Sequence, residues 1–414
     1  MSDSSSTSPK PSRSVGRLLY DGFSSFAFAT FLLTLLLIIT FFGTLEQVEH
    51  GLWQSQQKYF ESWLITSIDV GDWHVPVLIP GGFLVMVLLF INMTFGAVIR
   101  IRKNPRTVGV IIAHVSILFL LFAGFVEYFG KKDGNLALFE GQTSDEFQSY
   151  HDSVIEIEKV QPEPKDGKRT AMVIPASHFQ DLSQGKARRF THESLPFDLV
   201  VSNYEVNAEP RRVGEQQRSI QADGYYIQPA PRLPEAELNL DAAYVDVVNK
   251  KDNTRQKGII WRAARAPWTV QVGEDVYTIS LSRRIWKMPF AVRLDKFERE
   301  VHPGTERARK FTSHVAKLVD DREEKKIITM NAPLRDNGLV LFQASFSQER
   351  SVAGGMKNRS VFAVVENPSD NWPLYATIAV SVGLLIHMAG QLTRFLSRAK
   401  KQKEGKGLAN GAAV

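Results

Sequence analysis

The stretch that decides the fold is Val108-Gly-Val-Ile-Ile-Ala-His-Val-Ser-Ile-Leu-Phe-Leu-Leu-Phe-Ala-Gly-Phe-Val126. It is long and apolar enough to cross a bilayer as a helix, because a hydrocarbon core of about 30 Å requires about 20 helical residues. His114 interrupts this run. An imidazole in hydrocarbon costs free energy, at least a few kcal/mol if it is charged, so it usually marks a site, a relay or a metal ligand. His114 is therefore the first candidate functional residue.

Three further runs have the same apolar character. The four predicted spans cover residues 23–43, 75–99, 108–129 and 372–395, so the sequence predicts an integral membrane protein. The first run is longer than the apolar part of a signal peptide and lacks a small-x-small cleavage pattern, so we expect it to remain as an anchor. The predicted parts are a tail (1–22), three helices (23–129) with a loop (44–74) and a basic link (100–107), an exported domain (130–371), a fourth helix (372–395) and a second tail (396–414).

The positions of the basic residues predict the orientation. Lys and Arg are concentrated in the tail before the first span, in the basic link and after the fourth span, so these three places are expected in the cytoplasm. Together with Arg394 at the end of the fourth span, they hold thirteen Lys and Arg against three Asp and Glu, a net charge of +10, whereas the whole chain carries +6. Topology and attraction to the anionic lipid bilayer explain this excess, and nucleic-acid binding is not indicated. We expect a bacterial inner membrane, cytoplasmic termini and an exported large domain.

The exported domain is predicted to be rich in β-strands. Alternating or β-branched runs at 154–160, 276–281, 290–297 and 360–365 indicate strands. Asp336-Asn-Gly338 is typical of a hairpin turn between residues 328–330 and 339–343, since Asn and Gly accept positive φ. The stretch 162–252 is less periodic and is expected to be a loop-rich insertion. The predicted fold class is an α + β membrane protein, with four transmembrane helices and an antiparallel sandwich or barrel-like domain between the third and fourth.

The chain contains no cysteine. This excludes disulfides, thiol chemistry and covalent haem attachment to this chain. The exported domain also lacks Gly-x-Ser-x-Gly, His-Glu-x-x-His and phosphate-binding loop motifs. An enzyme that acts alone is therefore disfavoured, and binding or presenting a ligand at the membrane is the better interpretation.

A second histidine, His387, lies in the fourth predicted span. At 1.5 Å per residue, His114 and His387 are each expected roughly 10 Å below the cytoplasmic surface. Two neutral imidazoles at one level could supply both axial ligands of a haem iron, which makes both residues candidates for cofactor binding. The alternative is that each imidazole forms a hydrogen bond with a backbone carbonyl or with a serine, Ser116 or Ser381.

The other histidines show weaker patterns. His74 follows Trp73 and is expected in an aromatic belt at the membrane surface, and His50 has a similar interfacial position. His302 and His314 are twelve residues apart and match no metal-binding motif.

Several motifs occur in an order that resembles the ResB (CcsB) family. In the membrane part they are Gly43-Thr44, Asn92, Ala113–Leu118 and Ala123-Gly124. In the exported part they are Pro289–Gly304, Phe311–Ser313, Met330–Leu334 and Gly338–Phe346, followed by Asn367-Pro368. Their order, together with three spans, an exported domain and a fourth span, carries the resemblance.

The resemblance implies a part in System II cytochrome c biogenesis. In this pathway a ResB-like subunit and a CcsA/ResC-like membrane subunit move haem b across the membrane for attachment to apocytochrome c. The family's membrane histidine corresponds to His114, which implies that His114 is a ligand of the haem iron. The resemblance also suggests that the basic link meets the haem propionates through Arg100, Arg102, Lys103 and Arg106. The Trp-rich haem-presenting motif of the partner is absent, so this chain is not expected to complete the ligation alone.

Two other hypotheses remain open. The chain could be a membrane-anchored scaffold whose exported domain binds a partner protein, with the histidines only packing helices. This scaffold would keep full activity without His114 and His387. No family motif supports a role for His387. A transporter for another substrate is the third hypothesis, weakened by the presence of only four spans and no repeated broken-helix pattern.

Overall fold

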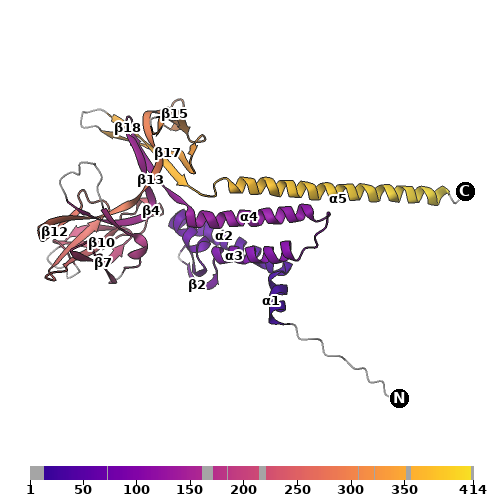
Figure 1. Cartoon of the computed structure of the whole chain (residues 1–414), viewed down its shortest axis with the longest axis horizontal. Helices are drawn as coiled ribbons and strands as arrows, with labels where there is room; N and C mark the ends of the chain where they lie inside the picture. The colour runs from indigo at the N-terminus through magenta and orange to yellow at the C-terminus, as the bar shows by residue number, and fades with distance from the viewer. Residues whose placement is uncertain are drawn as a thin grey trace, which may run out of the picture. The chain divides into compact units, whose positions relative to one another are not determined.

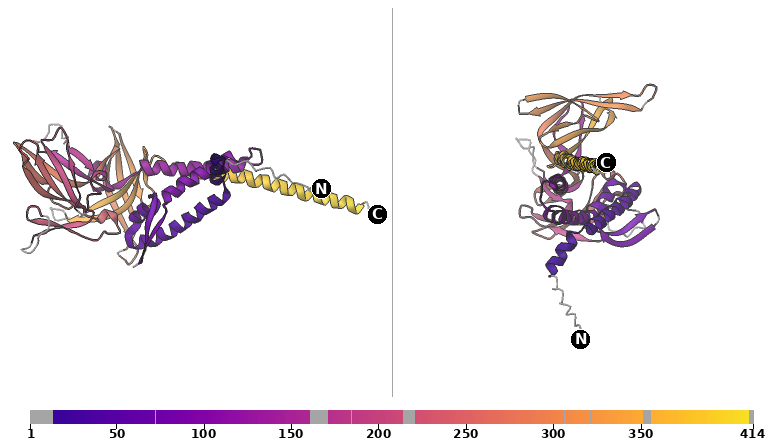
Figure 2. Two further views of the ribbon diagram at one scale, coloured as in Figure 1. Left: turned by 90° about the horizontal axis from the view of Figure 1, so that it is seen from below. Right: turned by 90° about the vertical axis from the view of Figure 1, so that its right-hand side faces the viewer.

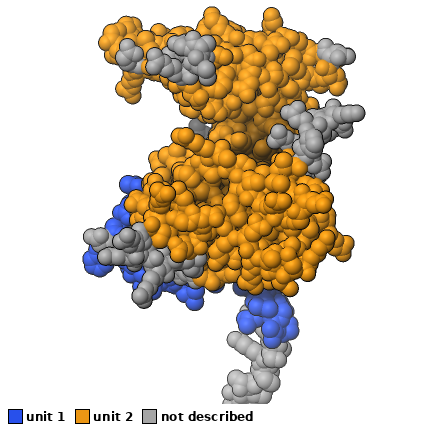
Figure 3. Space-filling view, turned by 90° about the vertical axis from the view of Figure 1, so that its left-hand side faces the viewer, with its two compact units in different colours: residues 1–49, 55–130, 368–414 blue, residues 50–54, 131–367 orange. Residues whose placement is uncertain are grey.

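The computed structural model describes residues 14–71, 73–160, 171–183, 185–213, 221–305, 307–320, 322–350 and 356–411. The chain forms two compact units, which Figure 3 shows in different colours. Unit 1 comprises residues 1–49, 55–130 and 368–414, and unit 2 comprises residues 50–54 and 131–367. Residues 1–13 of the predicted N-terminal tail and 412–414 of the C-terminal tail lie outside the described residues.

Unit 1 contains the apolar helices. Among the described residues, four helices are long and apolar enough to cross a membrane, and they correspond to the predicted spans: Phe26–Phe60, Gly82–Ile99, Val108–Gly130 and Trp372–Lys400. The elements, labelled in Figure 1, are α1 (Val15–Phe23), α2 (Phe26–Ser55), η1 (Gln56–Phe60), α3 (Gly82–Met93), η2 (Thr94–Ile99), α4 (Val108–Gly130) and α5 (Trp372–Gly411). The further views in Figure 2 show α5 as one continuous helix.

The predicted start of the second span, at Val75, is wrong. Residues 75–80 lie in β2 (Trp73–Pro80), which pairs with β1 (Leu64–Val70) as an antiparallel hairpin, and α3 begins only at Gly82. Pro76 and Pro80 each lack an amide hydrogen and have a fixed φ, so a helix cannot run regularly through this segment. The segment predicted as a loop (44–74) is therefore ordered as the end of α2, a π-helical turn and most of this hairpin.

The break between α1 and α2 is held by α3. The buried side-chain amide of Asn92 donates hydrogen bonds to the carbonyl oxygens of Phe23, at 2.6 Å, and Ser25, at 3.1 Å. One turn later, a Cβ on Gly96 would lie 2.9 Å from the carbonyl oxygen of Ser24. The carbonyl of Phe23 at the helix break thus finds a donor within an apolar unit, where an unpaired carbonyl would cost several kcal/mol.

Unit 2 is built from strands, and every strand pairing among its described residues is antiparallel, as predicted. One sheet has the order β11-β10-β7-β6 and a larger one the order β15-β14-β13-β4-β3-β18-β17-β16, with β5 and β12 attached to β4 and β13. The strands are β3 (Lys132–Phe139), β4 (Thr143–Lys159), β5 (Ala171–Pro175), β6 (Ala187–Phe190), β7 (Phe197–Glu205), β8 (Ala208–Arg212), β9 (Tyr225–Pro229), β10 (Ala242–Asn249), β11 (Arg255–Trp261), β12 (Trp268–Val272), β13 (Asp275–Val301), β14 (Ala308–Val319), β15 (Arg322–Thr329), β16 (Leu334–Asp336), β17 (Leu339–Arg350) and β18 (Met356–Glu366). Short helices η3 (Ala176–His178) and η4 (Ala236–Leu238) lie between them.

Among its described residues, unit 2 has two large hydrophobic cores and a smaller cluster around Tyr244, and its surface forms two lobes in Figure 3. The first core includes Ile155, Phe197 and Val245, and the second includes Phe147 and Phe362. β4 and β13 supply residues to both cores and are paired along much of their length (Figure 1). The two lobes are therefore joined by shared strands as well as by a connecting chain.

β13 combines two strands that were predicted separately, at 276–281 and 290–297. Its buried side chains are at positions 277, 279 and 281 in the first core and at 288, 290, 292 and 294 in the second. The parity of the buried positions changes between Leu281 and Met288, and the pairing of β13 with β4 is irregular there. This loss of alternation is why the sequence suggested two strands.

The prediction of a loop-rich insertion at 162–252 is wrong for the described part of that stretch. It contains β5 to β9 and almost all of β10, and β7 and β10 are the central strands of the four-stranded sheet. Phe197, Leu199 and Val201 are fully buried. Pro and charged residues lie mainly in the connections, where they dilute the strand pattern over a long window.

The predicted hairpin turn is present, with one change of partner. Asn337 and Gly338 have φ values of 47° and 78°, the left-handed conformation that these residue types accept. The strand before the turn is β16, which pairs with the start of β17, whereas residues 328–330 are not part of this hairpin.

Candidate functional site

His114 lies on α4 beside the helix face that is buried. The buried residues of α4 are Gly109, Ala113, Ser116 and Ala123, and a residue one position after Ala113 is rotated by about 100° around the helix. The imidazole Nδ1 lies 2.7 Å from the carbonyl oxygen of Val110, one turn earlier. The predicted alternative of a backbone hydrogen bond is thus observed, while the hydroxyl of Ser116 donates to a different carbonyl.

This hydrogen bond fixes the tautomer of a neutral His114. A ring nitrogen that contacts a carbonyl oxygen must be the one that carries the hydrogen, so Nε2 keeps a free lone pair. Metal-binding histidines are commonly oriented by such a bond from the second ring nitrogen to a backbone carbonyl. The bond to Val110 is therefore compatible with a role in metal binding as well as with simple packing.

Helices α4 and α5 pack with their backbones in close contact. A Cβ on Gly109 would lie 2.5 Å from the carbonyl oxygen of Gly383, and a Cβ on Gly383 would lie 2.7 Å from the carbonyl oxygen of Gly109. Contacts this short exclude any side chain at either position. Small residues allow membrane helices to approach in this way, and no planar group of the size of a porphyrin fits between the two backbones at this crossing.

His387 lies at this crossing rather than opposite His114. A Cβ on Gly109 would lie 2.7 Å from the backbone nitrogen of His387, so His387 is level with a residue five positions before His114. Five residues of helix correspond to roughly 7 Å along the axis. The expectation that the two histidines share one level is therefore wrong, because the close approach of the glycines sets a different register from the one estimated by depth.

The environment of the His387 ring also differs from that of His114. Its Nε2 lies 3.2 Å from the side-chain nitrogen of Gln391. Its Nδ1 is buried and has no hydrogen-bond partner within the part of the chain that the structure describes. The free ring nitrogen is thus Nδ1 in His387 and Nε2 in His114. The ligand roles predicted for both histidines stay predictions.

The other end of the α4–α5 interface is aromatic. Trp372 stacks on Phe119 and Phe122, with ring centroids 5.3 Å and 6.1 Å apart. The hydroxyl of Ser369 donates to the carbonyl oxygen of Ala123 at 2.9 Å. The two helices are thus fixed at both ends of their contact, which holds the level of each histidine.

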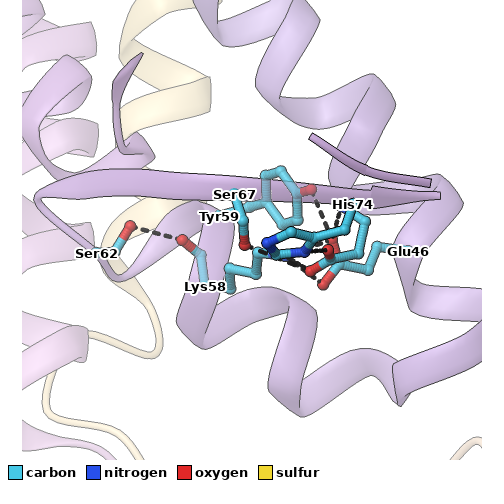
Figure 4. Close-up of polar contacts among 7 residues, drawn as sticks. Glu46, Lys58, Tyr59, Ser62, Ser67 and His74 are labelled. Atoms are coloured by element: carbon cyan, nitrogen blue, oxygen red, sulfur yellow. Dashed lines mark hydrogen bonds and ion pairs between the residues drawn. The ribbon is translucent and has the colours of Figure 1, made fainter. Parts of the chain in front are cut away.

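A network of charged side chains, drawn in Figure 4, ties β1 and β2 to the end of the first long helix. Lys58 Nζ lies 2.8 Å from both carboxylate oxygens of Glu46 and 2.6 Å from Asp69 Oδ2. The hydroxyl of Tyr59 donates to Glu46 at 2.6 Å, and His74 Nδ1 contacts the second oxygen of Asp69. Glu46 is almost fully buried, so this pairing with Lys58 and Tyr59 compensates for the loss of its hydration.

The network also changes the pKa of a carboxyl group in β1. The hydrogen bond from Lys58, more than the contact with His74, lowers the pKa of Asp69 below its usual value. Sequence analysis missed this network. The available signal was Lys58, the lone basic residue in a segment rich in carboxylates, because a single cation among several acids is a natural ion-pair partner.

No cluster of three or more His, Cys, Asp or Glu side chains suited to a metal ion occurs among the described residues. His314 instead lies 3.6 Å from a carboxylate oxygen of Glu298. Of the four basic residues of the link, Arg100 donates a hydrogen bond to the hydroxyl of Ser24 at 3.0 Å, which anchors the link to the α1–α2 break.

Two motif residues of the β-rich unit form a buried polar cluster. Ser313 Oγ lies 2.5 Å from Gln343 Oε1, and both side chains contact the hydroxyl of Ser360, at 2.9 and 3.0 Å. The three residues come from β14, β17 and β18, so the cluster links β14 to the neighbouring strands β17 and β18, which lie apart from it in the sheet order. Its role is structural, because all its members are buried and their hydrogen bonds are satisfied internally.

A comparison with curated proteins finds no match to this chain. The model of the ResB-like family matches residues 261–360, which span β12 to the start of β18 and include the motifs from Pro289 to Phe346. The motifs of the membrane part, among them Asn92 and His114, lie outside the matched segment. The match is confined to this segment, over which the chain is similar to the ResB-like family. It is consistent with a ResB/CcsB-like protein and suggests a role in cytochrome c biogenesis.

Proposed function

We propose that this chain handles haem as cargo during cytochrome c biogenesis, with His114 as an axial ligand of the haem iron. The observation that carries the proposal is the hydrogen bond from His114 Nδ1 to the carbonyl oxygen of Val110, at 2.7 Å. It leaves Nε2 with a free lone pair inside an apolar helix. The four apolar helices and the ResB-like match support the membrane setting.

The second axial ligand is proposed to come from the CcsA/ResC-like partner subunit. His387 cannot face His114 across a porphyrin while Gly109 and Gly383 hold the two backbones together. Haem bound by His114 therefore lies beside the α4–α5 interface, on a side that a partner subunit can cover. The proposal includes cytoplasmic termini in a bacterial inner membrane and an exported unit 2 that meets apocytochrome c, supported by the distribution of Lys and Arg.

The visible absorption spectrum tests the role of His114. The full-length protein is purified in detergent with and without the co-expressed partner, as the native chain and as His114→Ala and His387→Ala variants. We expect a Soret band in the native protein that is lost or shifted in His114→Ala and restored by added imidazole. His387→Ala is the matched control on the neighbouring helix and should retain the band. A Soret band that is unchanged in His114→Ala would refute the assignment.

Deletion of the gene tests the pathway independently of the ligand. We expect holocytochrome c to disappear while b-type cytochromes remain, since haem synthesis itself is not affected. Normal amounts of holocytochrome c would contradict a role in its biogenesis. Full holocytochrome c production by a protein that lacks both membrane histidines would instead favour the scaffold hypothesis.

A further inference from the structure

A second candidate site lies wholly within unit 2. A cavity of about 240 Å³ is bordered by β4, β7, β13, the end of β11 and the segment around η4. Its wall carries the guanidinium groups of Arg262 and Arg283, together with Asp241, Tyr204 and His151. These residues were not singled out by any sequence motif, because the fold brings them together from three strands and two connecting segments.

One of the two arginines, Arg262, is paired with a buried carboxylate. Arg262 Nη2 forms an ion pair with Asp241, whose side chain is 2% exposed, and donates to the hydroxyl of Ser153 at 2.6 Å. The other oxygen of Asp241 accepts a hydrogen bond from Tyr204 at 2.9 Å. Asp241 is thus fully engaged by Arg262 and Tyr204, so it does not neutralise Arg283.

Several donors around the cavity lack partners. The Nε and Nη1 atoms of Arg262 are buried and make no hydrogen bond to any described residue. The side chain as a whole is 12% exposed. Arg283 makes two long hydrogen bonds of 3.4 Å, to the carbonyl oxygens of Ala236 and Glu237. Burial, and then the nearby charge of Arg262, lower the pKa of Arg283 to about 10. Buried guanidinium N–H groups without an acceptor, such as those of Arg262, cost free energy that a bound anion would offset.

A flat ring system borders the same cavity. Trp53, from the segment 50–54 that belongs to unit 2, stacks on His151 with ring centroids 4.7 Å apart and an angle of 21° between the planes. Burial lowers the pKa of His151, so its ring is neutral near pH 7. Its buried Nδ1 has no partner among the described residues. The cavity therefore combines cationic donors with an apolar wall.

We propose that this cavity binds a carboxylate group, which Arg262 and Arg283 recognise and the Trp53–His151 pair covers. A guanidinium group is planar and presents paired N–H donors that match the two oxygens of a carboxylate. The carboxylate belongs either to a small molecule or to a polypeptide, and both sources supply the same chemistry. The inference is independent of haem binding by His114, because it concerns residues of unit 2 alone.

The test uses the full-length protein in lipid nanodiscs and isothermal titration with benzoate, its neutral analogue benzamide, and inorganic phosphate. We expect saturable benzoate binding that is about tenfold or more tighter than that of benzamide or phosphate. Arg283→Gln should weaken benzoate binding by about tenfold or more, because it removes one recognising cation. Arg211→Gln is the matched control, since Arg211 is exposed and pairs with Glu209 on a hairpin of the same unit.

Two further variants protect the test against misfolding. Asp241→Asn removes the competing carboxylate and should strengthen benzoate binding, which a variant that is merely unstable would not do. Circular dichroism and the thermal midpoint of Arg283→Gln should match those of the native protein. Competition by a peptide with a free C-terminal carboxylate, but not by its amidated form, would identify a polypeptide ligand. Failure of both peptides to compete with bound benzoate would identify a small-molecule ligand.

The proposal is overturned by any of three results. Benzoate that binds no more tightly than benzamide would show that charge is not recognised. Phosphate that binds more tightly than benzoate would show a general oxyanion site. An equal loss of affinity in Arg283→Gln and Arg211→Gln would show that the cavity is not where the anion binds.

Discussion

Replacing Gly109 by alanine should push helices α4 and α5 apart. The new Cβ would lie 2.5 Å from the carbonyl oxygen of Gly383 and 2.7 Å from the backbone nitrogen of His387. Both are backbone atoms that cannot rotate away, so the helices must separate by about 1 Å to restore ordinary contact distances. Overpacking of this kind typically costs about 1–3 kcal/mol. Gly124→Ala is the matched control on the same helix, since a Cβ there meets no atom within 4 Å.

The two glycine variants are compared by reversible unfolding of the full-length protein in mixed micelles, followed by circular dichroism. Both gain the same helix propensity from alanine, up to about 1 kcal/mol, so the difference between their free energies of unfolding isolates the interhelical contact. We expect Gly109→Ala to be less stable than Gly124→Ala by about 1–3 kcal/mol. Equal stabilities would show that α4 and α5 do not meet at Gly109, and the different levels assigned to the two histidines would then fail as well.

Three other predictions concern polar contacts. Asn92→Ala should lower the free energy of unfolding in micelles by about 1–2 kcal/mol, because the carbonyls of Phe23 and Ser25 lose the hydrogen bonds from this amide. An unchanged free energy of unfolding would contradict these hydrogen bonds. The pKa of Asp69 is lowered mainly by Lys58, so the ionised carboxylate stabilises the folded state above the ordinary pKa of about 3.9. This stabilisation is lost as the pH falls through the lowered pKa. The thermal midpoint should therefore drop below about pH 4, and Asp69→Asn should show a smaller drop in the same titration. Gln343→Ala should cost about 1–3 kcal/mol in thermal unfolding, because the buried hydroxyls of Ser313 and Ser360 then keep only their bond to each other. The exposed Gln348→Ala should be nearly neutral, and similar losses would argue against the buried cluster.

The apolar helices were predicted well because their signal is local. Four runs of about twenty apolar residues identify four helices, whatever they pack against. The start of the second helix was the exception, since β2 is itself apolar and only Pro76 and Pro80 distinguish it from a span. Local composition thus identifies the helices, and proline chemistry corrects one boundary.

The relation between the two membrane histidines could not be predicted from depth alone. The level of His387 is set by the contact of Gly109 with Gly383, which depends on two glycines that are 274 positions apart in the sequence. The Asp241–Arg262–Arg283 cluster escaped prediction for the same reason. Its members lie on β13 and in the segments next to β10 and β11, and strand order is not encoded in the periodicity of any one strand.

The shared strand β13 makes the two cores of unit 2 sensitive to its length. Side chains of a strand alternate between faces, so one inserted or deleted residue reverses the facing of every residue that follows until a bulge restores it. An insertion between Leu281 and Met288 would leave the first core intact and turn the apolar side chains from Met288 to Leu294 outward. The segment between the cores therefore tolerates substitution far better than a change of length, and the two lobes cannot be exchanged as separate modules during evolution.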